Sequence, residues 1–128
     1  MAPFDTTALV SHLRNRFGDD LRMVGYVDER AAPEALYVRD DLESRVTDER
    51  LRALVDEFMM GSMESDRVLH ELGYGPRNAT IHDFENVQIV FVNINEFEGV
   101  GFGVDGNVFQ GGDGLVDEIL SVTSPQRE

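Results

Sequence analysis

A run of glycines near the end of the chain has the spacing of a nucleotide-binding motif. Gly101, Gly103 and Gly106 fit the pattern G-x-G-x-x-G. In dinucleotide-binding folds these glycines lie in the turn between a strand and a helix, where backbone N–H groups face the pyrophosphate. Here the first two lie inside an expected antiparallel strand instead. The pattern therefore favours a structural role over nucleotide binding.

Two loop sequences resemble ion sites but lack a required feature. Residues 111–114 (GGDG) precede an expected helix, yet Asp113 places a negative charge where an anion would bind. Residues 105–107 (DGN) begin like a calcium loop, but Phe109 stands where the next oxygen ligand is needed. We expect a helix cap at Asp113 and no dedicated calcium site.

The histidines His12, His70 and His82 are scattered along the sequence. His70 lacks the second histidine of a zinc-binding helix, and His82 and Asp83 alternate to opposite faces of an expected strand. Cysteine is absent, and no serine, histidine and aspartate set has the spacing of a nucleophile elbow. We therefore expect no metal site, no cofactor, no catalytic residues and no enzymatic activity.

Arg39, Asp40 and Asp41 form the polar cluster that the sequence singles out. They come at the end of an expected strand, residues 35–39. The planar guanidinium of an arginine can fork onto a carboxylate such as that of Asp41, or onto the carbonyl groups at a helix C-terminus. A structural bridge at the strand end is favoured over contact with a ligand.

An apolar group of residues is the candidate interaction surface. Met59, Met60 and Met63 lie close together in the second half of the chain's central helical region. Methionines there mostly fill a core, but exposed methionines also make adaptable binding surfaces. Together with Phe97 and Phe109, they form the surface at which we expect a protein partner or a second copy of the chain.

The charge balance is the strongest global signal. The 128 residues carry 25 acidic and 11 basic side chains, for a net charge of −14, and every basic residue is an arginine. Such a surface repels nucleic acid and anionic membranes. Acidic excess without lysine suits a protein that stays dissolved in concentrated salt, where repulsion between carboxylates is screened. With no basic-then-apolar leader at its start, the sequence predicts a cytoplasmic protein of a halophile.

Residues 78–105 predict the hydrophobic floor of the fold, three consecutive antiparallel strands. In residues 87–94 (VQIVFVNI) both faces are mainly apolar, which is typical of an interior strand covered on both sides. In residues 97–105 the glycines Gly99, Gly101 and Gly103 share one face. A glycine stripe indicates close approach by another group. A helix is the preferred neighbour, with a partner chain or a ligand as the alternative.

The periodicity elsewhere completes an α+β domain with the order α-β-β-α-β-β-β-α. Apolar residues recur at helical spacing in some segments and alternate in others. Gly61 and Ser62 interrupt the second helix, and the sequence leaves open whether residues 63–72 continue it. The expected helices are residues 5–17, 47–59, 63–72 and 113–122; the expected strands are residues 21–28, 35–39, 80–84, 87–94 and 97–105. We expect one domain, residues 1–123, with a single antiparallel sheet of about five strands, and a polar tail, residues 124–128.

Two resemblances accompany this interpretation. The element order is similar to that of the roadblock/longin group of profilin-like α/β sandwiches. The sequence LRMVGY at residues 21–26 and YVRDD at residues 37–41 resembles a small haloarchaeal family of unknown function, over about residues 18–106. The resemblance implies a fold and a habitat and supplies no chemistry.

Two functions are compatible with these features. The first is a non-enzymatic protein-interaction or regulatory module, a homodimer or a subunit of a larger assembly, because no catalytic set is present. The alternative is a small-ligand sensor of PAS/GAF-like architecture, with the ligand held between sheet and helices. A pocket near the glycine stripe would favour the sensor.

The charge pattern makes a prediction about salt. The melting temperature should rise between about 0.1 M and about 3 M KCl, because screening removes repulsion among the carboxylates. Circular dichroism at a series of KCl concentrations measures this. A flat melting temperature across the series would contradict the assignment of the surface to a halophile.

Overall fold

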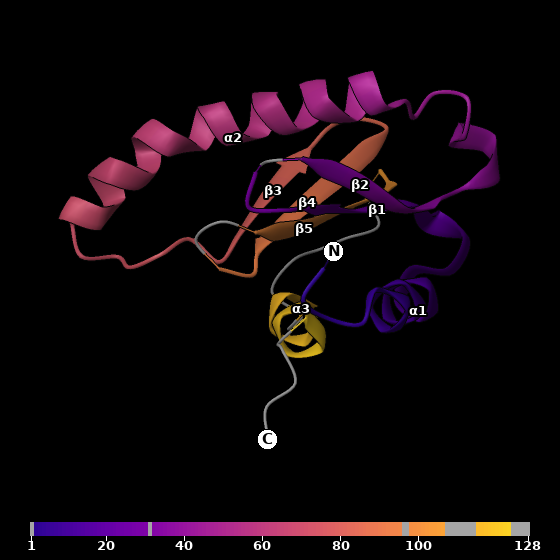
Figure 1. Ribbon diagram of the computed structural model, residues 1–128, viewed down its shortest axis with the longest axis horizontal. Coiled ribbons are helices and arrows are strands. Elements are labelled where there is room, and N and C mark those ends of the chain that lie inside the picture. The colour runs from indigo at the N-terminus through magenta and orange to yellow at the C-terminus, as the bar shows by residue number, and fades with distance from the viewer. Residues whose placement is uncertain (1, 31, 96–97, 107–114, 124–128) are drawn as a thin grey trace.

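The structure is a computed structural model that describes residues 2–30, 32–95, 98–106 and 115–123. Within these ranges the backbone alone is described for residues 58–66 and 115. The elements follow the expected order (Figure 1): α1 (Thr6–Phe17), β1 (Leu21–Val27), β2 (Pro33–Val38), α2 (Asp48–Glu71), β3 (Ala79–Asp83), β4 (Val87–Asn93), β5 (Gly99–Asp105) and α3 (Leu115–Thr123). Short 3-10 turns follow α1 and β2, at Gly18–Asp20 and Asp40–Leu42.

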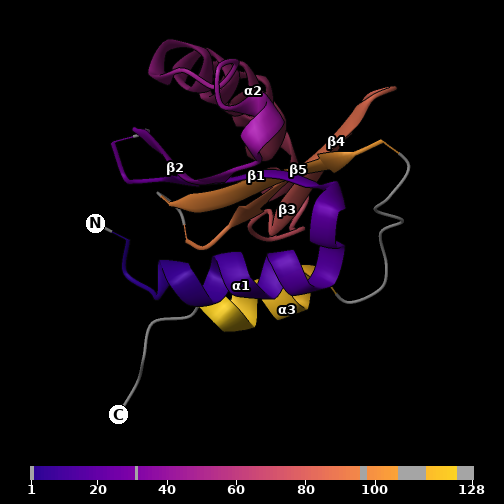
Figure 2. The same cartoon turned by 90° about the vertical axis from the view of Figure 1, so that its right-hand side faces the viewer.

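All five strands join one antiparallel sheet in the order β2-β1-β5-β4-β3. The hairpin β1–β2 and the meander β3–β4–β5 meet where β1 pairs with β5. Helices α1 and α3 lie side by side on one face of the sheet, and α2 lies on the other (Figure 2). The expected fold class, a single five-stranded antiparallel sheet with helices packed on it, is confirmed.

The face beneath α1 and α3 holds the densest core. Alternate residues of β4 and β5 point to this face, as the pleat requires, and α1 and α3 supply the opposing side chains. The residues with 2% or less exposure include Leu9, Leu13, Leu21, Val24, Tyr26, Val90, Val92, Val100, Phe102, Val104 and Ile119. Burying each aliphatic side chain contributes about 1.5–3 kcal/mol, so this layer contributes most of the stabilising free energy.

The helix ends carry the signals that the sequence contains. Asp5 accepts a hydrogen bond from the backbone N–H of Ala8 at 3.1 Å and caps α1. Thr47 does the same for α2, through the N–H of Arg50 at 3.2 Å. Such caps satisfy backbone donors that have no partner inside the helix. After α2 the chain turns at Gly73, whose φ of 78° lies in the left-handed region that favours glycine.

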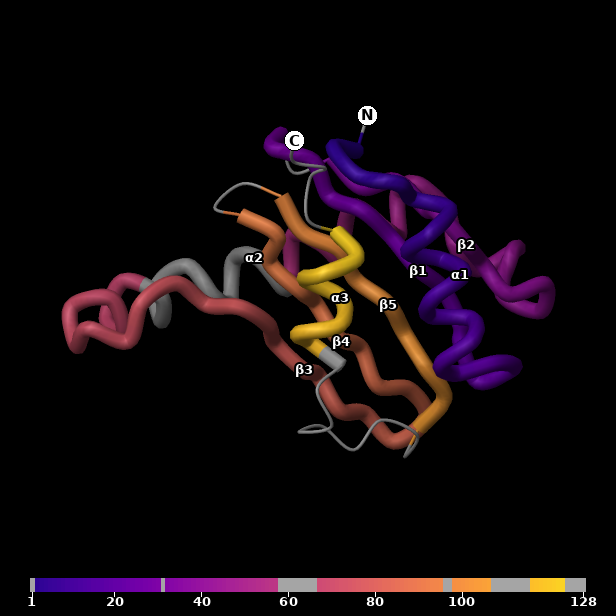
Figure 3. Tube along the Cα trace, turned by 90° about the horizontal axis from the view of Figure 1, so that it is seen from below, coloured from indigo at the N-terminus to yellow at the C-terminus, as the bar shows by residue number. Residues whose placement is uncertain are grey.

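The second helix is longer than the sequence suggested. We expected a break at Gly61 and Ser62, but α2 continues through both as one helix of 24 residues. An interior glycine costs only about 1 kcal/mol relative to alanine, and no proline lies inside the segment. At 1.5 Å per residue the helix is about 36 Å long. Its C-terminal turns therefore extend past the sheet beside β3 (Figures 1 and 3).

The glycine stripe of β5 is covered first by an aromatic ring, and not directly by a helix as we expected. A Cβ at Gly99 would lie 2.5 Å from Cε1 of Phe91, and one at Gly101 would lie 3.3 Å from Cδ2 of the same ring. Phe91 stands on the neighbouring strand β4, opposite Gly101. At Gly103 the nearest atom would be Cγ2 of Val87 at 3.7 Å, an ordinary contact distance. Gly99 is thus required by packing, whereas Gly103 leaves space.

This difference predicts opposite effects for two matched substitutions. Gly99→Ala should lower the free energy of unfolding by about 1–3 kcal/mol, because the new methyl group displaces the Phe91 ring. Gly103→Ala should leave it unchanged or raise it by up to about 1 kcal/mol, because alanine restricts the unfolded chain and meets no close atom. Urea unfolding of both variants measures the difference. Equal effects would show that Phe91 does not constrain this strand.

Candidate functional site

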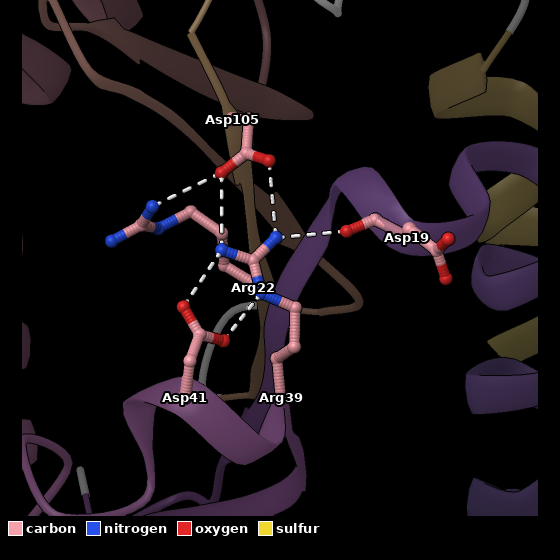
Figure 4. Close-up of polar contacts among 5 residues, drawn as sticks. All are labelled: Asp19, Arg22, Arg39, Asp41 and Asp105. Atoms are coloured by element: carbon pink, nitrogen blue, oxygen red, sulfur yellow. Dashed lines mark hydrogen bonds and ion pairs between the residues drawn. The ribbon is translucent and has the colours of Figure 1, made fainter.

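A guanidinium with two carboxylate partners lies where β1 begins and β2 and β5 end (Figure 4). Arg39 Nε donates to Asp41 at 2.6 Å, and Arg39 Nη1 donates to Asp105 at 3.0 Å. The same Nη1 donates to the backbone carbonyl of Asp19 at 2.8 Å. The fork that the sequence suggested for Arg39 and Asp41 is thus one part of a larger cluster.

Arg22 completes this cluster through a bulge in β1. The pairing of β1 with β5 shifts between Leu21 and Met23, so Arg22 is the extra residue. Its Cβ lies on the same face as Gly103, and its Nη1 donates to Asp105 at 3.1 Å. Asp105 therefore binds two arginines, one within β1 and one directly after β2.

Asp40 lies beside the cluster and takes no side-chain part in it among the described contacts. It is exposed and begins the 3-10 turn, where its backbone carbonyl accepts from Glu43 at 3.4 Å. No local pattern pointed to Asp105 as a member, because it stands 66 residues from Arg39. Only the pairing of β1 with β5 brings that carboxylate to the end of β2.

The charges in the cluster hold one another ionised. Hydrogen bonds from Arg39 lower the pKa of both Asp41 and Asp105. The same bonds raise the pKa of Arg39 above its usual value. A carboxylate with a depressed pKa and paired oxygens is a poor proton donor or acceptor near neutral pH. The cluster is suited to clamping three strands, not to acid–base catalysis.

A second polar pair closes the opposite end of β1 and β5. The hydroxyl of Tyr26 donates a hydrogen bond to Glu98, which also accepts from the Asn95 side chain at 2.8 Å. Burial, followed by the Glu98 carboxylate, raises the pKa of Tyr26. The tyrosine and then Asn95 lower the pKa of Glu98. This pair ties the connection between β4 and β5 to β1.

A pocket of about 250 Å³ lies between α2 and the sheet. The glycines Gly25, Gly101 and Gly103 belong to its floor, and Leu51 and Val55 of α2 belong to its roof. The pocket exists because these glycines leave the centre of the sheet without side chains, so that α2 has little to pack against there. The remaining lining residues are Arg22, Met23, Tyr26, Val27, Pro33, Glu34, Leu42, Arg45, Val46, Leu54, Val87, Ile89, Phe91 and Phe102.

Exposed apolar side chains gather where α2 overhangs the sheet. Val68, Leu72 and Tyr74 are 46%, 62% and 71% exposed; we call these three residues the overhang surface. Ile81, on the strand that follows, is 45% exposed, and Phe84, directly after that strand, is 51% exposed. Large apolar side chains grouped in this way mark interaction sites more often than isolated ones do.

The candidate interaction surface from the sequence falls outside the described side chains. Met59, Met60 and Met63 lie in α2, where only the backbone is described, and Phe97 and Phe109 lie outside the described residues. The expected cap Asp113 lies outside them as well. That surface therefore stays a prediction.

The histidines are placed apart by the fold. His12 on α1 contacts Glu118 on α3, with Nε2 3.1 Å from Oε1, so it links the two helices of the dense face. His70 lies near the end of α2 and His82 on β3. In the described part of the chain, no group of three or more histidine or acidic side chains could hold a metal ion.

Across the described segments, none of the helices combines the length and the apolar character that crossing a membrane requires.

The polar cluster makes a prediction about acid stability. The depressed pKa of Asp105 means that its contribution is present above its usual pKa of about 3.9 and is lost as pH falls below that value. Asp105→Asn should lower the free energy of unfolding at pH 7 by about 1 kcal/mol, after discounting for solvent screening. The free energy of unfolding of this variant should also decrease less between pH 7 and pH 3 than that of the wild type. Urea unfolding from pH 7 to pH 3 measures both effects.

Asp40→Asn is the matched control, since it removes an equal charge at the residue next to Arg39 and Asp41. It should leave the pH dependence of unfolding unchanged. Equal profiles for the two variants would contradict a stabilising role for Asp105.

The fold is shared with solved structures of low sequence identity. A structure of MglB with tetrameric arrangement and the gliding protein MglB from Thermus thermophilus both superpose with a TM-score of 0.63 at 13% identity. Each alignment covers 96% of this chain, and 91% and 92% of the respective relatives. Myxococcus xanthus MglB gives a TM-score of 0.55 at 13% identity, over 91% of this chain and 82% of its own. At this identity the likeness shows the fold alone, which is of the roadblock/longin type.

The sequence comparisons are consistent with the resemblance to a family of unknown function. No curated protein matches the sequence. Residues 7–124 match a family described as a domain of unknown function, DUF7522, which covers nearly all of the helices and strands. The haloarchaeal origin stays a prediction. Since the match extends over most of its length, the chain belongs to the DUF7522 family.

Proposed function

We propose that this protein is a non-enzymatic regulatory module that works by binding protein, in the first place a second copy of itself. The overhang surface is the observation that carries the proposal. Val68, Leu72 and Tyr74 are exposed at the end of a helix that projects past the sheet. At this end of α2 the described side chains of Val68 and Leu72 stay exposed, so a partner would supply their cover.

The neighbouring strand β3 offers backbone groups to the same partner. Within the part of the chain that the structure describes, β3 pairs only with β4. Phe84 N–H donates to Val87 at 2.9 Å, and Asn93 N–H donates to the carbonyl of Asn78 at 2.8 Å. Even-numbered positions of β3 therefore bond to β4. The N–H and C=O groups that point away from β4 belong to Ala79, Ile81 and Asp83.

The net charge of −14 opposes association at low salt. In concentrated salt this repulsion is screened, and the burial of apolar surface still favours association. We therefore place the protein in the cytoplasm of a halophilic archaeon, where such salt is present. The tetrameric arrangement of one MglB structure with the same fold supports self-association on this fold. Met59, Met60 and Met63 are our candidates for extending the surface along α2.

The pocket favours a second candidate function, a small-ligand sensor. It lies beside the glycine stripe and beneath α2, the helix that carries the overhang surface. A ligand that changed the seating of α2 would thereby change the surface offered to a partner. Such a sensor would be compatible with the interaction module, because the two sites lie at different parts of the same helix.

Self-association makes a direct prediction. Light scattering coupled to size exclusion in about 2 M KCl should give a mass of two or more chains. The double variant Val68→Ser/Leu72→Ser should raise the dissociation constant at least about tenfold, because it removes apolar area worth more than about 1.4 kcal/mol. Ile81→Pro should also weaken association, since it removes an outward N–H while sparing the bonds to β4.

Ala53→Ser is the matched control, an apolar-to-serine change at an exposed position in the first half of α2. It should not affect the dissociation constant. A strictly monomeric wild-type protein would overturn the proposal. If Ala53→Ser weakened association as much as the double variant does, the overhang surface would not be the contact surface.

A further inference from the structure

We propose that the pocket beneath α2 binds a small molecule with an apolar body and one anionic head, of the class of medium-chain carboxylic acids. The inference rests on the second candidate function, the ligand sensor. It assigns the site and the chemical class of the ligand from the lining residues. Self-association through the overhang surface does not enter the argument.

The floor of the pocket is made of backbone. Gly25 of β1 pairs directly with Gly101 of β5 at the centre of the sheet, and Gly103 lies two residues further along. A Cβ at Gly25 would meet only the carbonyl oxygen of Glu34, at 3.5 Å, and one at Gly103 would meet nothing closer than 3.7 Å. Side chains would therefore fit at both positions, and their absence is what leaves the space open.

The walls are apolar. Met23 and Val27 of β1, Ile89 and Phe91 of β4, and Leu54 of α2 all line the pocket. Tyr26 and Phe102 contribute only backbone to it, because their rings pack on the other face, against Phe4 and Phe17. An apolar cavity of about 150 Å³ is large enough for benzene. At about 250 Å³, this pocket has room for a longer hydrocarbon chain.

Among the described lining residues, the side chains that bring charge to the pocket are both cationic. Arg22 and Arg45 line it, while Glu34 contributes its backbone, since its pairing with the core residue Tyr26 directs its side chain to the opposite face. Arg22 already binds Asp105 at 3.1 Å.

Arg45 is both exposed and part of the lining, so it stands at the mouth. Among the described residues no ion pair is made by Arg45. A carboxylate at the mouth would supply this guanidinium with a bidentate partner. The positive charge at the mouth thus favours an acid over a neutral or cationic molecule. The protein surface as a whole is acidic, so this position differs in sign from its surroundings.

The test uses octanoate and octanol as probes, in the lowest KCl concentration at which the full-length protein stays folded. Both have an apolar chain of the same length, and only octanoate has a charge for Arg45. Methyl-region NMR titration should show octanoate shifting Met23, Val55 and Ile89, while Leu9 and Leu13 on the opposite face stay unperturbed. Affinity should rise about fourfold for each added CH₂ from butanoate to octanoate, and octanol should bind about tenfold more weakly than octanoate.

Two kinds of variant separate the head group from the chain. Arg45→Gln should weaken octanoate about tenfold and leave octanol unchanged. Arg52→Gln, an exposed arginine of α2 outside the lining, makes the same change in net charge and should leave both unchanged. Gly103→Val should abolish binding of both probes by filling the floor. Leu54→Phe fills the pocket from α2 and gives the same readout if Gly103→Val does not fold.

Each remaining outcome overturns the proposal in a different way. If octanol binds as tightly as octanoate and Arg45→Gln changes neither, the anionic class is wrong while the sensor function stands. If no probe binds at millimolar concentration, the ligand site and the sensor function both fail.

Discussion

The pairing of β1 with β5 is the interaction on which the rest of the structure depends. It joins a hairpin and a three-stranded meander that are separated in sequence by the long helix α2. Polar contacts secure both ends of this pair of strands. Arg22 and Arg39 bind Asp105 at one end, and Tyr26 binds Glu98 at the other. Without this pairing there would be two small sheets, each with an apolar face too narrow to be covered.

The two faces of the joined sheet are unequal, and the difference originates in β5. Its residues Val100, Phe102 and Val104 point toward α1 and α3 and are almost completely buried. The opposite face carries glycines, one Phe91 ring and the pocket. One side of the protein is therefore close-packed and resists change. The other face holds α2 above the pocket.

Two of the arginines are used inside the protein, and the surface charge is left mainly to acidic side chains. Arg22 and Arg39 belong to an internal clamp, with about a quarter of each side chain exposed. The acidic excess of the chain, with a net charge of −14, keeps the exterior strongly hydrated. Attractive contacts with another protein must then come from uncharged groups, and the exposed apolar side chains at the end of α2 and on β3 are placed to provide them.

Much of the architecture could be predicted from sequence because its signals are local. Helix caps at Asp5 and Thr47, alternation in residues 87–94 and the turns at glycine act over a few residues. These signals identified the element order and the fold class. The break expected in the second helix was wrong because a single glycine costs less than the helical hydrogen bonds on either side of it provide.

The polar cluster and the pocket are formed by residues that are far apart in the sequence and close in space, and no local pattern predicts such contacts. The sequence pointed to Arg39 and Asp41, but Asp105 joins them only because sheet order brings β5 beside β1. The glycine stripe was visible in the sequence, whereas the ring that covers part of it and the pocket over the remainder follow from which strand lies next to β5. Composition and periodicity alone determined the charge, the elements and the class of fold. Tertiary structure alone decided which residues meet, because strand pairing joins distant segments, and the sequence of one strand does not indicate which strand will pair with it.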